Sequence, residues 1–353
     1  MSQAPTVLVT GGAGFIGSAV VRHLIGETGW SVVNLDRLSY AASPAALFEV
    51  KESPRHRFVH GDIRDRDLVS SLLAEHRPCA VLHLAAETHV DRSIDGPEAF
   101  MEHNLMGSFH LLEAVRAYWS KLSGAEAAQF RYVQVSTDEV FGSLGPDDAA
   151  FNLDTQYQPR SPYSASKAGG DHLARAWAHT WGLPVMVTNC TNNYGPYQFP
   201  EKLIPLMILR GLRGEPLPVY GTGANRRDWL HVEDHARGLC LALERGQPGG
   251  TYLFGGGTEC SNLEVVDAIC RILDRLKPAD RPRRDLIQMV ADRPGHDFRY
   301  AMDASSTLDG LGWSPAIGFD EGIARTVQWY LDHCDWWEPI LASRYDGSRL
   351  GLG

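Results

Sequence analysis

The chain has 353 residues, of which 44% are hydrophobic and 22% are charged, a composition typical of a globular protein with one large α/β domain and a smaller second domain. Its formal charge of −10 at pH 7 disfavours the basic face with which nucleic-acid-binding proteins contact phosphates, so we expect no nucleic-acid partner. No hydrophobic run approaches the roughly 20 residues that span a bilayer, and the N-terminus lacks the features of a signal peptide. We therefore expect a cytoplasmic protein with no membrane partner.

Six cysteines are scattered along the chain without a Cys-x-x-Cys pair. They are typical of buried thiols in a reducing compartment and indicate neither a disulfide framework nor a zinc site. His231 and His235 stand four residues apart, but the spacing around them matches none of the known zinc motifs. We expect no metal.

Short β-rich runs alternate with amphipathic stretches in the first half of the chain, a pattern typical of a parallel sheet covered by helices. We expect strands at residues 6–10, 31–36, 57–60, 80–84, 131–136 and 184–189, and helices at residues 15–25, 97–118 and 163–181. Right-handed crossovers then predict an α/β fold with a doubly wound, Rossmann-type parallel sheet.

After about residue 193 the chain is punctuated by proline and glycine, which indicates a smaller lobe. We expect a larger domain over residues 1–192, with a return segment near residues 226–237, and a smaller α/β lobe over most of residues 193–353. Four C-terminal aromatic residues at near-helical spacing should serve packing rather than chemistry: Trp329, Tyr330, Trp336 and Trp337.

A glycine-rich segment at residues 10–17, Thr-Gly-Gly-Ala-Gly-Phe-Ile-Gly, lies between the first expected strand and the first expected helix. Glycines alone are a weak signal, but this context is that of a dinucleotide-binding loop. Gly11 permits a tight turn, Gly14 lets the backbone approach a pyrophosphate, and Gly17 lets the helix pack closely on the strand. The positive end of the helix dipole then faces the phosphates.

Asp36 ends the second expected strand, 19 residues after Gly17, where an acid accepts hydrogen bonds from the hydroxyls of the adenosine ribose. Its charge should repel a 2′-phosphate, which favours NAD over NADP. Arg37 complicates this expectation, because an arginine can accommodate that phosphate. Asp62 and Ile63 close the third strand and are placed to meet the adenine. Asp62 also suits the role of N-cap for a helix over residues 64–73.

Tyr163 and Lys167 stand at the start of the third expected helix. Positions four apart lie on the same face, one turn apart. A lysine ammonium near a phenol favours the phenolate and lowers a pKa that is ordinarily about 10. Tyr163 is therefore a candidate general base. A surface Tyr–Lys pair has the same spacing by chance in many proteins, but the glycine loop upstream makes the catalytic interpretation the stronger one.

Two adjacent acids, Asp138 and Glu139, follow the fifth expected strand at the edge where ligands bind in such sheets. Loss of water next to a ketone needs one base for the acidified hydrogen and one acid for the departing hydroxyl. Two carboxyl groups held in opposite protonation states fit that task. An enzyme that only oxidises and reduces a single carbon has no use for the pair. A solvated acidic loop is the competing interpretation.

The glycine loop and the Tyr163–Lys167 pair together resemble the extended short-chain dehydrogenase/reductase family. The chain is further similar, over nearly its whole length, to the dTDP-glucose 4,6-dehydratase branch of that family. The segments that carry this resemblance are HLAAETHVDRSI (83–94), VSTDE (135–139), SPYSASK (161–167), TNCTNNYGP (188–196), PEKLIP (200–205), RDWLHVED (227–234) and DRPGHD (292–297).

The resemblance implies that Tyr163 removes the proton of the C4 hydroxyl, with Thr137 as its hydrogen-bonding helper, and that Lys167 also binds the nicotinamide ribose. Asp138 would be the acid for the C6 hydroxyl and Glu139 the base at C5. It implies NAD contacts from Gly11, Gly14, Phe15, Ile16, Gly17, Asp36, Arg37, Leu38, Ser39, Asp62, Ile63, Leu84, Ala85, Ala86, Thr88, Tyr163, Lys167 and Asn193. It implies substrate contacts from Thr88, Thr137, Asn192, Glu201, Lys202, Leu203, Pro218, Tyr220, Arg227, Asn262, Asp292, Arg293 and His296.

Three departures from the family's pattern stand out: Phe141 replaces a tyrosine, Ala42-Ser43 replaces Gly-Asn, and His103 replaces a threonine. Ala42 and His103 bear on cofactor contacts, so the tightness of NAD binding is the property that they put in question. The family also implies a homodimer, with the helices expected at residues 97–118 and 163–181 in the interface.

Two kinds of alternative remain at the level of sequence. One is another enzyme of this fold, namely a UDP-sugar 4,6-dehydratase, an epimerase or a decarboxylase. The other is a non-catalytic NAD-binding regulator, which the presence of both Tyr163 and Lys167 disfavours.

Overall fold

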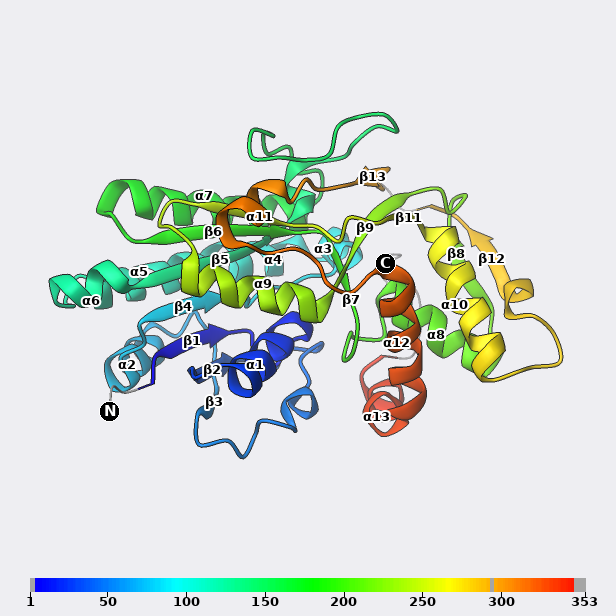
Figure 1. The fold of residues 1–353 in the computed structure, drawn as a ribbon, viewed down its shortest axis with the longest axis horizontal. Helices are drawn as coiled ribbons and strands as arrows, with labels where there is room; N and C mark the ends of the chain where they lie inside the picture. Colours follow the sequence, from blue (N-terminus) through cyan, green and yellow to red (C-terminus); the bar gives the residue numbers. More distant parts are fainter. Residues whose placement is uncertain (1–3, 293–294, 346–353) are drawn as a thin grey trace.

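The computed structural model describes residues 4–292 and 295–345. Its largest element is a seven-stranded sheet in the order β3-β2-β1-β4-β5-β6-β10 (Figure 1), and all of its strand pairings are parallel. The strands are β1 (Thr6–Thr10), β2 (Ser31–Asp36), β3 (His56–His60), β4 (Ala80–His83), β5 (Arg131–Thr137), β6 (Val185–Cys190) and β10 (Thr251–Phe254). The first six have the order of a Rossmann fold, so the predicted fold class is confirmed.

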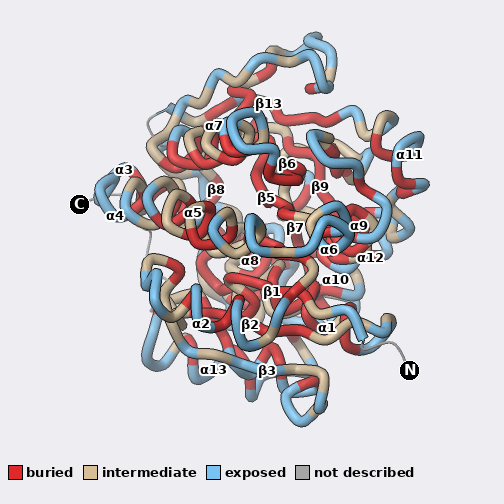
Figure 2. Tube along the Cα trace, turned by 90° about the vertical axis from the view of Figure 1, so that its left-hand side faces the viewer, coloured by how far each residue is buried: buried red, intermediate tan, exposed pale blue. Residues whose placement is uncertain are grey.

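Helices cover both faces of this sheet because its central strands are apolar on both sides, as in β1, where Val7, Leu8 and Val9 are all buried. On one face α1 (Phe15–Glu27) packs against α9 (Val232–Arg245). On the other face lie α2 (Arg66–His76), α5 (Gly107–Trp119) and α7 (Pro162–Trp181). Figure 2 shows the buried residues running through the strands between these two layers.

The helix expected at residues 97–118 is divided into three parts. It begins as α4 (Pro97–Phe100), continues through the π-helical turn η2 (Met101–Met106) and ends as α5. A π turn adds a residue to the helical repeat and often marks a functional site. Here the amide of Asn104 bonds the backbone N–H and C=O of Glu87, at 2.8 and 3.0 Å. The turn therefore fixes the loop that follows β4.

The predicted helix cap at Asp62 is wrong. The helix α2 begins at Arg66, and the side chain of Asp65 accepts the capping bond from the N–H of Leu68. Asp62 instead binds Arg64 through both the backbone N–H and the guanidinium. The carboxylate of Asp62 therefore lies at the carboxyl edge of the sheet, between β3 and α2.

The smaller lobe has its own core, which gathers apolar residues of α8, α10, α12 and α13. Figure 1 shows these helices with β8 and β12 at one end of the molecule. Their bounds are α8 (Leu203–Arg213), β8 (Leu217–Tyr220), α10 (Asn262–Leu276), η4 (Arg283–Leu286), β12 (Ile287–Val290), α12 (Phe319–Asp332) and α13 (Cys334–Ser343). The C-terminal aromatics pack in this core, as expected, with Tyr330, Trp336 and Trp337 buried.

A second sheet joins the two parts, with β9 paired to β11, β13 and β7. The remaining elements are η1 (Pro44–Leu47), α3 (Val90–Asp95), α6 (Gly124–Gln129), η3 (Asp138–Phe141), β7 (Asn192–Tyr194), β9 (Arg226–His231), β11 (Glu259–Ser261), β13 (Arg299–Tyr300) and α11 (Ser305–Leu311). Residues after 237 also contribute to the first domain, because β10 pairs with β6 in the main sheet. The division near residue 193 itself stays a prediction.

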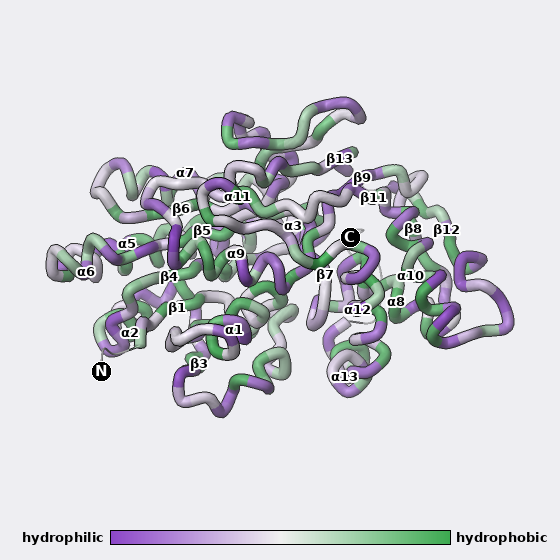
Figure 3. The backbone as a smooth tube through the Cα atoms, in the orientation of Figure 1, coloured by the Kyte–Doolittle hydropathy of each residue, from purple (hydrophilic) through white to green (hydrophobic). Residues whose placement is uncertain are grey.

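Hydrophobic stretches concentrate inside the molecule and hydrophilic ones in its outer loops (Figure 3). Within the described residues, no helix combines the length and the apolar character that crossing a membrane requires.

Candidate active site

Two cavities meet at the carboxyl edge of the main sheet, the edge at which open α/β sheets bind ligands. The first, of about 290 Å³, lies against the glycine loop and the ends of β2, β5 and β6. The second, of about 440 Å³, extends from that edge to α8, β8 and β12. Five residues line both cavities: Thr88, Glu139, Asn192, Glu201 and Lys202. Ligands in the two cavities would meet at these residues.

The glycine loop forms one wall of the first cavity. Gly11 has φ +76°, and a Cβ on it would lie 2.6 Å from the backbone N of Ala85, so only glycine fits there. A Cβ on Gly17 would overlap the carbonyl oxygen of Gly11 and lie 2.8 Å from the Cα of Gly12. The following helix α1 starts with no side-chain cap and no acid in its first turn. Its N-terminus therefore remains available to an anion.

Asp36 lies at the far end of this wall with its carboxylate oriented by two backbone groups. Oδ2 accepts from the N–H of Ala13 at 2.9 Å, and Oδ1 accepts from the N–H of Leu38 at 2.7 Å. Burial raises the pKa of Asp36, and these hydrogen bonds act in the opposite direction. Leu38, with φ +56°, does not line the cavity, and its predicted contact with the cofactor stays a prediction. An anion-binding loop followed by an oriented acid fits a dinucleotide.

Asp138 and Glu139 lie at the start of η3 directly after β5; Asp138 lines the first cavity, and Glu139 lines both. The Asp138 side chain is buried, and its Oδ1 accepts from the hydroxyl of Thr137 at 3.0 Å. Burial, and next the charge of Glu139, raise the pKa of Asp138 well above its usual range. The raised pKa favours the protonated form of Asp138 beside a second carboxyl group, which is the arrangement expected for a general acid next to a general base.

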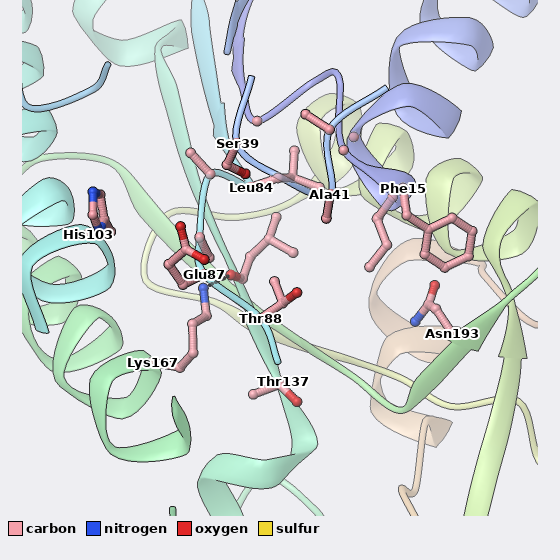
Figure 4. Close-up of a pocket in the computed structure, with 18 of the residues that line it drawn as sticks. Phe15, Ser39, Ala41, Leu84, Glu87, Thr88, His103, Thr137, Lys167 and Asn193 are labelled. Carbon is pink, nitrogen blue, oxygen red and sulfur yellow. Dashed lines mark hydrogen bonds between the residues drawn. The ribbon is translucent and has the colours of Figure 1, made fainter. Parts of the chain in front are cut away.

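Tyr163 and Lys167 both line the first cavity, and Figure 4 shows Lys167 extending into it from α7. The Lys167 ammonium donates to the carbonyl of Val135 at 2.7 Å. The expectation that Lys167 lowers the pKa of Tyr163 is wrong for this structure: burial, and next the charge of Glu139, raise that pKa well above its ordinary value. A hydrogen bond with Thr137 opposes the rise, as its predicted helper role requires. The raised pKa favours the neutral phenol of Tyr163.

The second cavity carries the cations expected to meet an anionic substrate. The buried Arg227 guanidinium lies 4.3 Å from the ring centre of Tyr300 and donates to the carbonyl of Asp297 at 2.9 Å. The Lys202 ammonium lies 3.3 Å from the carbonyl of Thr88, between the two cavities. An arginine and a lysine in one cavity suit a diphosphate.

Most predicted site residues line one cavity or the other. In the first are Gly11, Gly14, Phe15, Ile16, Gly17, Asp36, Arg37, Ser39, Asp62, Ile63, Leu84, Ala85, Ala86, Thr88, Thr137, Tyr163, Lys167 and Asn193. In the second are Thr88, Asn192, Glu201, Lys202, Leu203, Pro218, Tyr220, Arg227, Asn262 and His296. Asp292 is absent from both linings and accepts a 2.6 Å bond from Nδ1 of His296, so it orients that histidine. Arg293 lies outside the described residues.

Other lining residues were not predicted as contacts. They include Glu87, His103, Cys190, Thr191, Gln198 and Phe199 in the first cavity and His89, Arg210, Tyr300 and Tyr345 in the second. His103 carried a signal, since it departs from the family's pattern, and Glu87 and His89 lie in a matching segment. Tyr345 comes from the C-terminal part of the chain, and no pattern in the sequence indicated it as a site residue.

Comparison with known proteins gives consistent results. The model of the family described as GDP-mannose 4,6 dehydratase matches residues 8–326. A dTDP-glucose 4,6-dehydratase of Neisseria meningitidis is 54% identical over 98% of this chain and 99% of that protein. One of Escherichia coli is 52% identical with the same coverage. The chain belongs to the dTDP-glucose 4,6-dehydratase family.

Solved structures of this family share the fold. DesIV of Streptomyces venezuelae, a dTDP-glucose 4,6-dehydratase solved with NAD and TYD bound, superimposes with a TM-score of 0.86 at 45% identity, over 95% of this chain and 99% of that one. A UDP-glucose 4-epimerase of Thermus thermophilus solved with NAD reaches a TM-score of 0.81 at 31% identity, over 93% and 99%. Because an epimerase has the same fold, the dehydratase family is distinguished by its site residues.

Gly17→Ala tests the glycine loop of this family member. The overlap with Gly11 forces the loop to shift, so we expect a loss of about 1–3 kcal/mol in stability and loss of dinucleotide from the purified protein. Thermal unfolding and the dinucleotide content measure the two effects. Gly26→Ala is the matched control, because it lies in the same helix and its Cβ would meet nothing within 4 Å. It should leave dinucleotide binding intact; equal losses in both variants would contradict the proposed role of the loop.

Proposed function

We propose that the chain is an NAD-dependent dTDP-glucose 4,6-dehydratase, a hydro-lyase that forms dTDP-4-keto-6-deoxyglucose. The observation that carries this proposal is the buried Asp138 in the dinucleotide-type cavity, with a raised pKa, directly before Glu139, which lines both that cavity and the cation-bearing cavity. Family membership at 52–54% identity supports the thymidine nucleotide. We retain the division into an NAD-binding domain (1–192, with 226–237) and a substrate-binding lobe (193–353).

The first cavity is the proposed NAD site. The N-terminus of α1 and Gly14 would hold the pyrophosphate, Asp36 the adenosine ribose and Lys167 the nicotinamide ribose. NAD, when bound, supplies the acceptor that takes the C4 hydrogen with its electron pair and later gives it to C6. Every other step falls to side chains of the protein.

Tyr163 receives the proton of the C4 hydroxyl. Because burial raises the pKa of Tyr163, the phenol needs activation for this step when NAD and the substrate are bound. Lys167 is a cation in the same cavity, one helical turn away. Thr137 links the phenol to Asp138, since it is hydrogen-bonded to both. Thr137 therefore orients the oxidation and elimination groups relative to each other.

Glu139 removes the C5 proton, which the C4 ketone has acidified, and Asp138 gives its proton to the departing C6 hydroxyl so that water leaves. Glu139 then returns a proton to C5 after the C4 hydrogen has reached C6. The raised pKa of Asp138 favours the protonated form that this step needs. General acid and general base each contribute about 10²- to 10⁴-fold in rate.

The second cavity would hold the nucleotide. Arg227 and Lys202 suit the diphosphate, and Asn192, Asn262 and His296 lie around the same cavity. Purified protein should convert dTDP-glucose, but not UDP-glucose at a comparable rate, into a product with the alkaline absorbance of a 4-keto sugar. No such product from dTDP-glucose would refute the substrate; turnover of UDP-glucose alone would favour the UDP-sugar dehydratase.

Tyr163→Phe should reduce the rate of C4 oxidation by about 10²- to 10⁴-fold, because it removes the base and leaves the ring. Rapid mixing with dTDP-glucose, followed by absorbance of the reduced nicotinamide, measures this rate directly. Tyr157→Phe is a suitable control, since Tyr157 bonds Asp171 rather than lining the cavities. Oxidation at the rate of the unmodified protein in the Tyr163 variant would exclude the role.

We further propose a homodimer in the cytoplasm. The proposed interface uses the helical regions at residues 97–118 and 163–181, where Met106 and Trp181 expose large apolar side chains. Covering such side chains is what a dimer interface provides. Light scattering of the purified chain tests it, and a monomer would refute it.

A further inference from the structure

Arg37 lines the first cavity directly after Asp36, yet its guanidinium is already engaged by other side chains. Nη2 forms an ion pair with Glu87, and Nη1 lies 2.5 Å from Nε2 of His103. Asp62 adds a third partner at 4.0 Å. Glu87 and His103 lie in the same part of the cavity wall, across the view from Phe15 and Asn193 (Figure 4).

The hydrogen bonds define the protonation of His103. Its Nδ1 lies 2.6 Å from the carbonyl oxygen of Ala99, which can only accept, so Nδ1 carries the proton. Its Nε2 faces a guanidinium, which can only donate, so Nε2 carries none. His103 thus accepts from Nη1 of Arg37, while Glu87 pairs with Nη2. The threonine typical of the family at this position has a shorter side chain.

The backbone around this cluster is fixed independently of the ion pair. Asn104 binds the N–H and C=O of Glu87 and also donates to Ser166 at 2.9 Å. The loop that carries Glu87 is thus attached to α7 and to the π turn that carries His103. This scaffold fixes the backbone of Glu87, whose carboxylate pairs with Arg37.

The charges around the cavity wall are mainly negative. Asp36, Asp62 and Glu87 all line it. Arg64, a nearby cation, is bonded to Asp62 and to Glu102 at 2.9 and 3.3 Å. An additional phosphate bound here would either displace Glu87 from Arg37 or lie beside three carboxylates. Repulsion between like charges makes this unfavourable in a partly buried site.

We propose that Glu87 and His103 are specificity-determining residues: they hold and neutralise Arg37, so that the cavity rejects an adenosine dinucleotide with a 2′-phosphate. The inference rests on the proposed function, because it requires a dinucleotide in the first cavity. It changes the role of Arg37. An arginine after the acid of β2 is ordinarily the group that accommodates the phosphate of NADP, and here its donors are taken up by the protein itself.

Glu87→Gln tests the proposal. The full-length protein is dialysed to equilibrium against mixtures of NAD⁺ and NADP⁺, and both dinucleotides are quantified in the protein compartment. Loss of the ion pair frees a cation and removes one negative charge, so the affinity ratio should move toward NADP⁺ by about tenfold or more. NAD⁺ occupancy in the absence of NADP⁺ should stay close to that of the unmodified protein.

Control variants separate the effect of holding Arg37 from the effect of removing any negative charge nearby. Glu102→Gln removes a carboxylate on the same π turn that bonds Arg64 rather than Arg37, and its ratio should equal that of the unmodified chain. Arg37→Ala added to Glu87→Gln should abolish the gain. His103→Ala should move the ratio in the same direction by less, and it carries the test if Glu87→Gln does not fold.

The outcomes are distinguishable. If the affinity ratio of NAD⁺ to NADP⁺ is unchanged in folded Glu87→Gln, or if it shifts equally in Glu102→Gln, the proposed role of Glu87 in holding Arg37 is wrong. Failure of the unmodified protein to bind NAD⁺ at all overturns the proposed function instead.

Discussion

Glu139→Gln should stop the reaction after C4 has been oxidised. The amide cannot accept the C5 proton, so turnover of dTDP-glucose should fall by about 10²- to 10⁴-fold, while rapid mixing shows reduced nicotinamide accumulating in the first turnover. The variant keeps the size and hydrogen-bonding reach of the side chain, so binding of the substrate should change little.

Glu139→Gln should also shift the pH dependence of the oxidation step. The charge of Glu139 is the second-largest cause, after burial, of the raised pKa of Tyr163. Without that charge the pKa of Tyr163 falls, so oxidation should reach its maximum at a lower pH than in the unmodified protein. Normal turnover, or the absence of reduced nicotinamide with an unchanged pH profile, would contradict the assignment of Glu139 as the C5 base.

Asp138→Asn should leave C4 oxidation largely in place and reduce the loss of water by about 10²- to 10⁴-fold. The reason is that asparagine fills the same buried space but has no proton to give to the C6 hydroxyl. Quenched samples of a single turnover, in which the reduced cofactor and the keto product are both quantified, separate the two steps.

The pH dependence of elimination follows from the direction of the Asp138 pKa. Since the acid works only when protonated and its pKa is raised, elimination in the unmodified protein should persist at neutral pH and decline as pH rises through that raised pKa. The Asp138→Asn variant should lose this decline along with the rate. Elimination at the normal rate in Asp138→Asn would exclude Asp138 as the acid.

Local patterns made the fold and much of the site predictable. Most strands of the main sheet are rich in buried apolar residues, and their predicted ends agree to within one residue for β1 and β2 and for the strands that carry the site, β5 and β6. The glycine loop, Asp36 and the acid pair follow strands directly. Parallel strands bring their carboxyl ends to one edge, so these residues had to converge.

What the sequence did not predict depends on contacts between distant segments. The contacts of Arg37 with Glu87 and His103 join the end of β2, the loop after β4 and the π turn. No local pattern indicates a π turn, because its hydrogen bonds compete closely with those of an α-helix. The placement of Leu38 outside the cavity likewise follows from a single positive φ.

The pKa of Tyr163 is raised instead of lowered for an electrostatic reason. Spacing along a helix indicates that Lys167 lies near the phenol, but it does not reveal that Lys167 is bonded to the carbonyl of Val135 or that two carboxyl groups also face the phenol. Burial is the largest cause of the shifted pKa of Asp138, Tyr163 and Lys167, and the extent of burial is a property of the folded cavity rather than of a motif.

The path of one hydrogen tests the central claim most directly. dTDP-glucose labelled with deuterium at C4 is converted by the purified protein in ordinary water, and the product is examined by NMR. The account predicts that the label moves to C6 and that C5 acquires hydrogen from solvent, because Glu139 and Asp138 eliminate water while the C4 hydrogen is held. Label that remains at C4 in a product with its C6 hydroxyl intact would show an enzyme without elimination and would contradict the account.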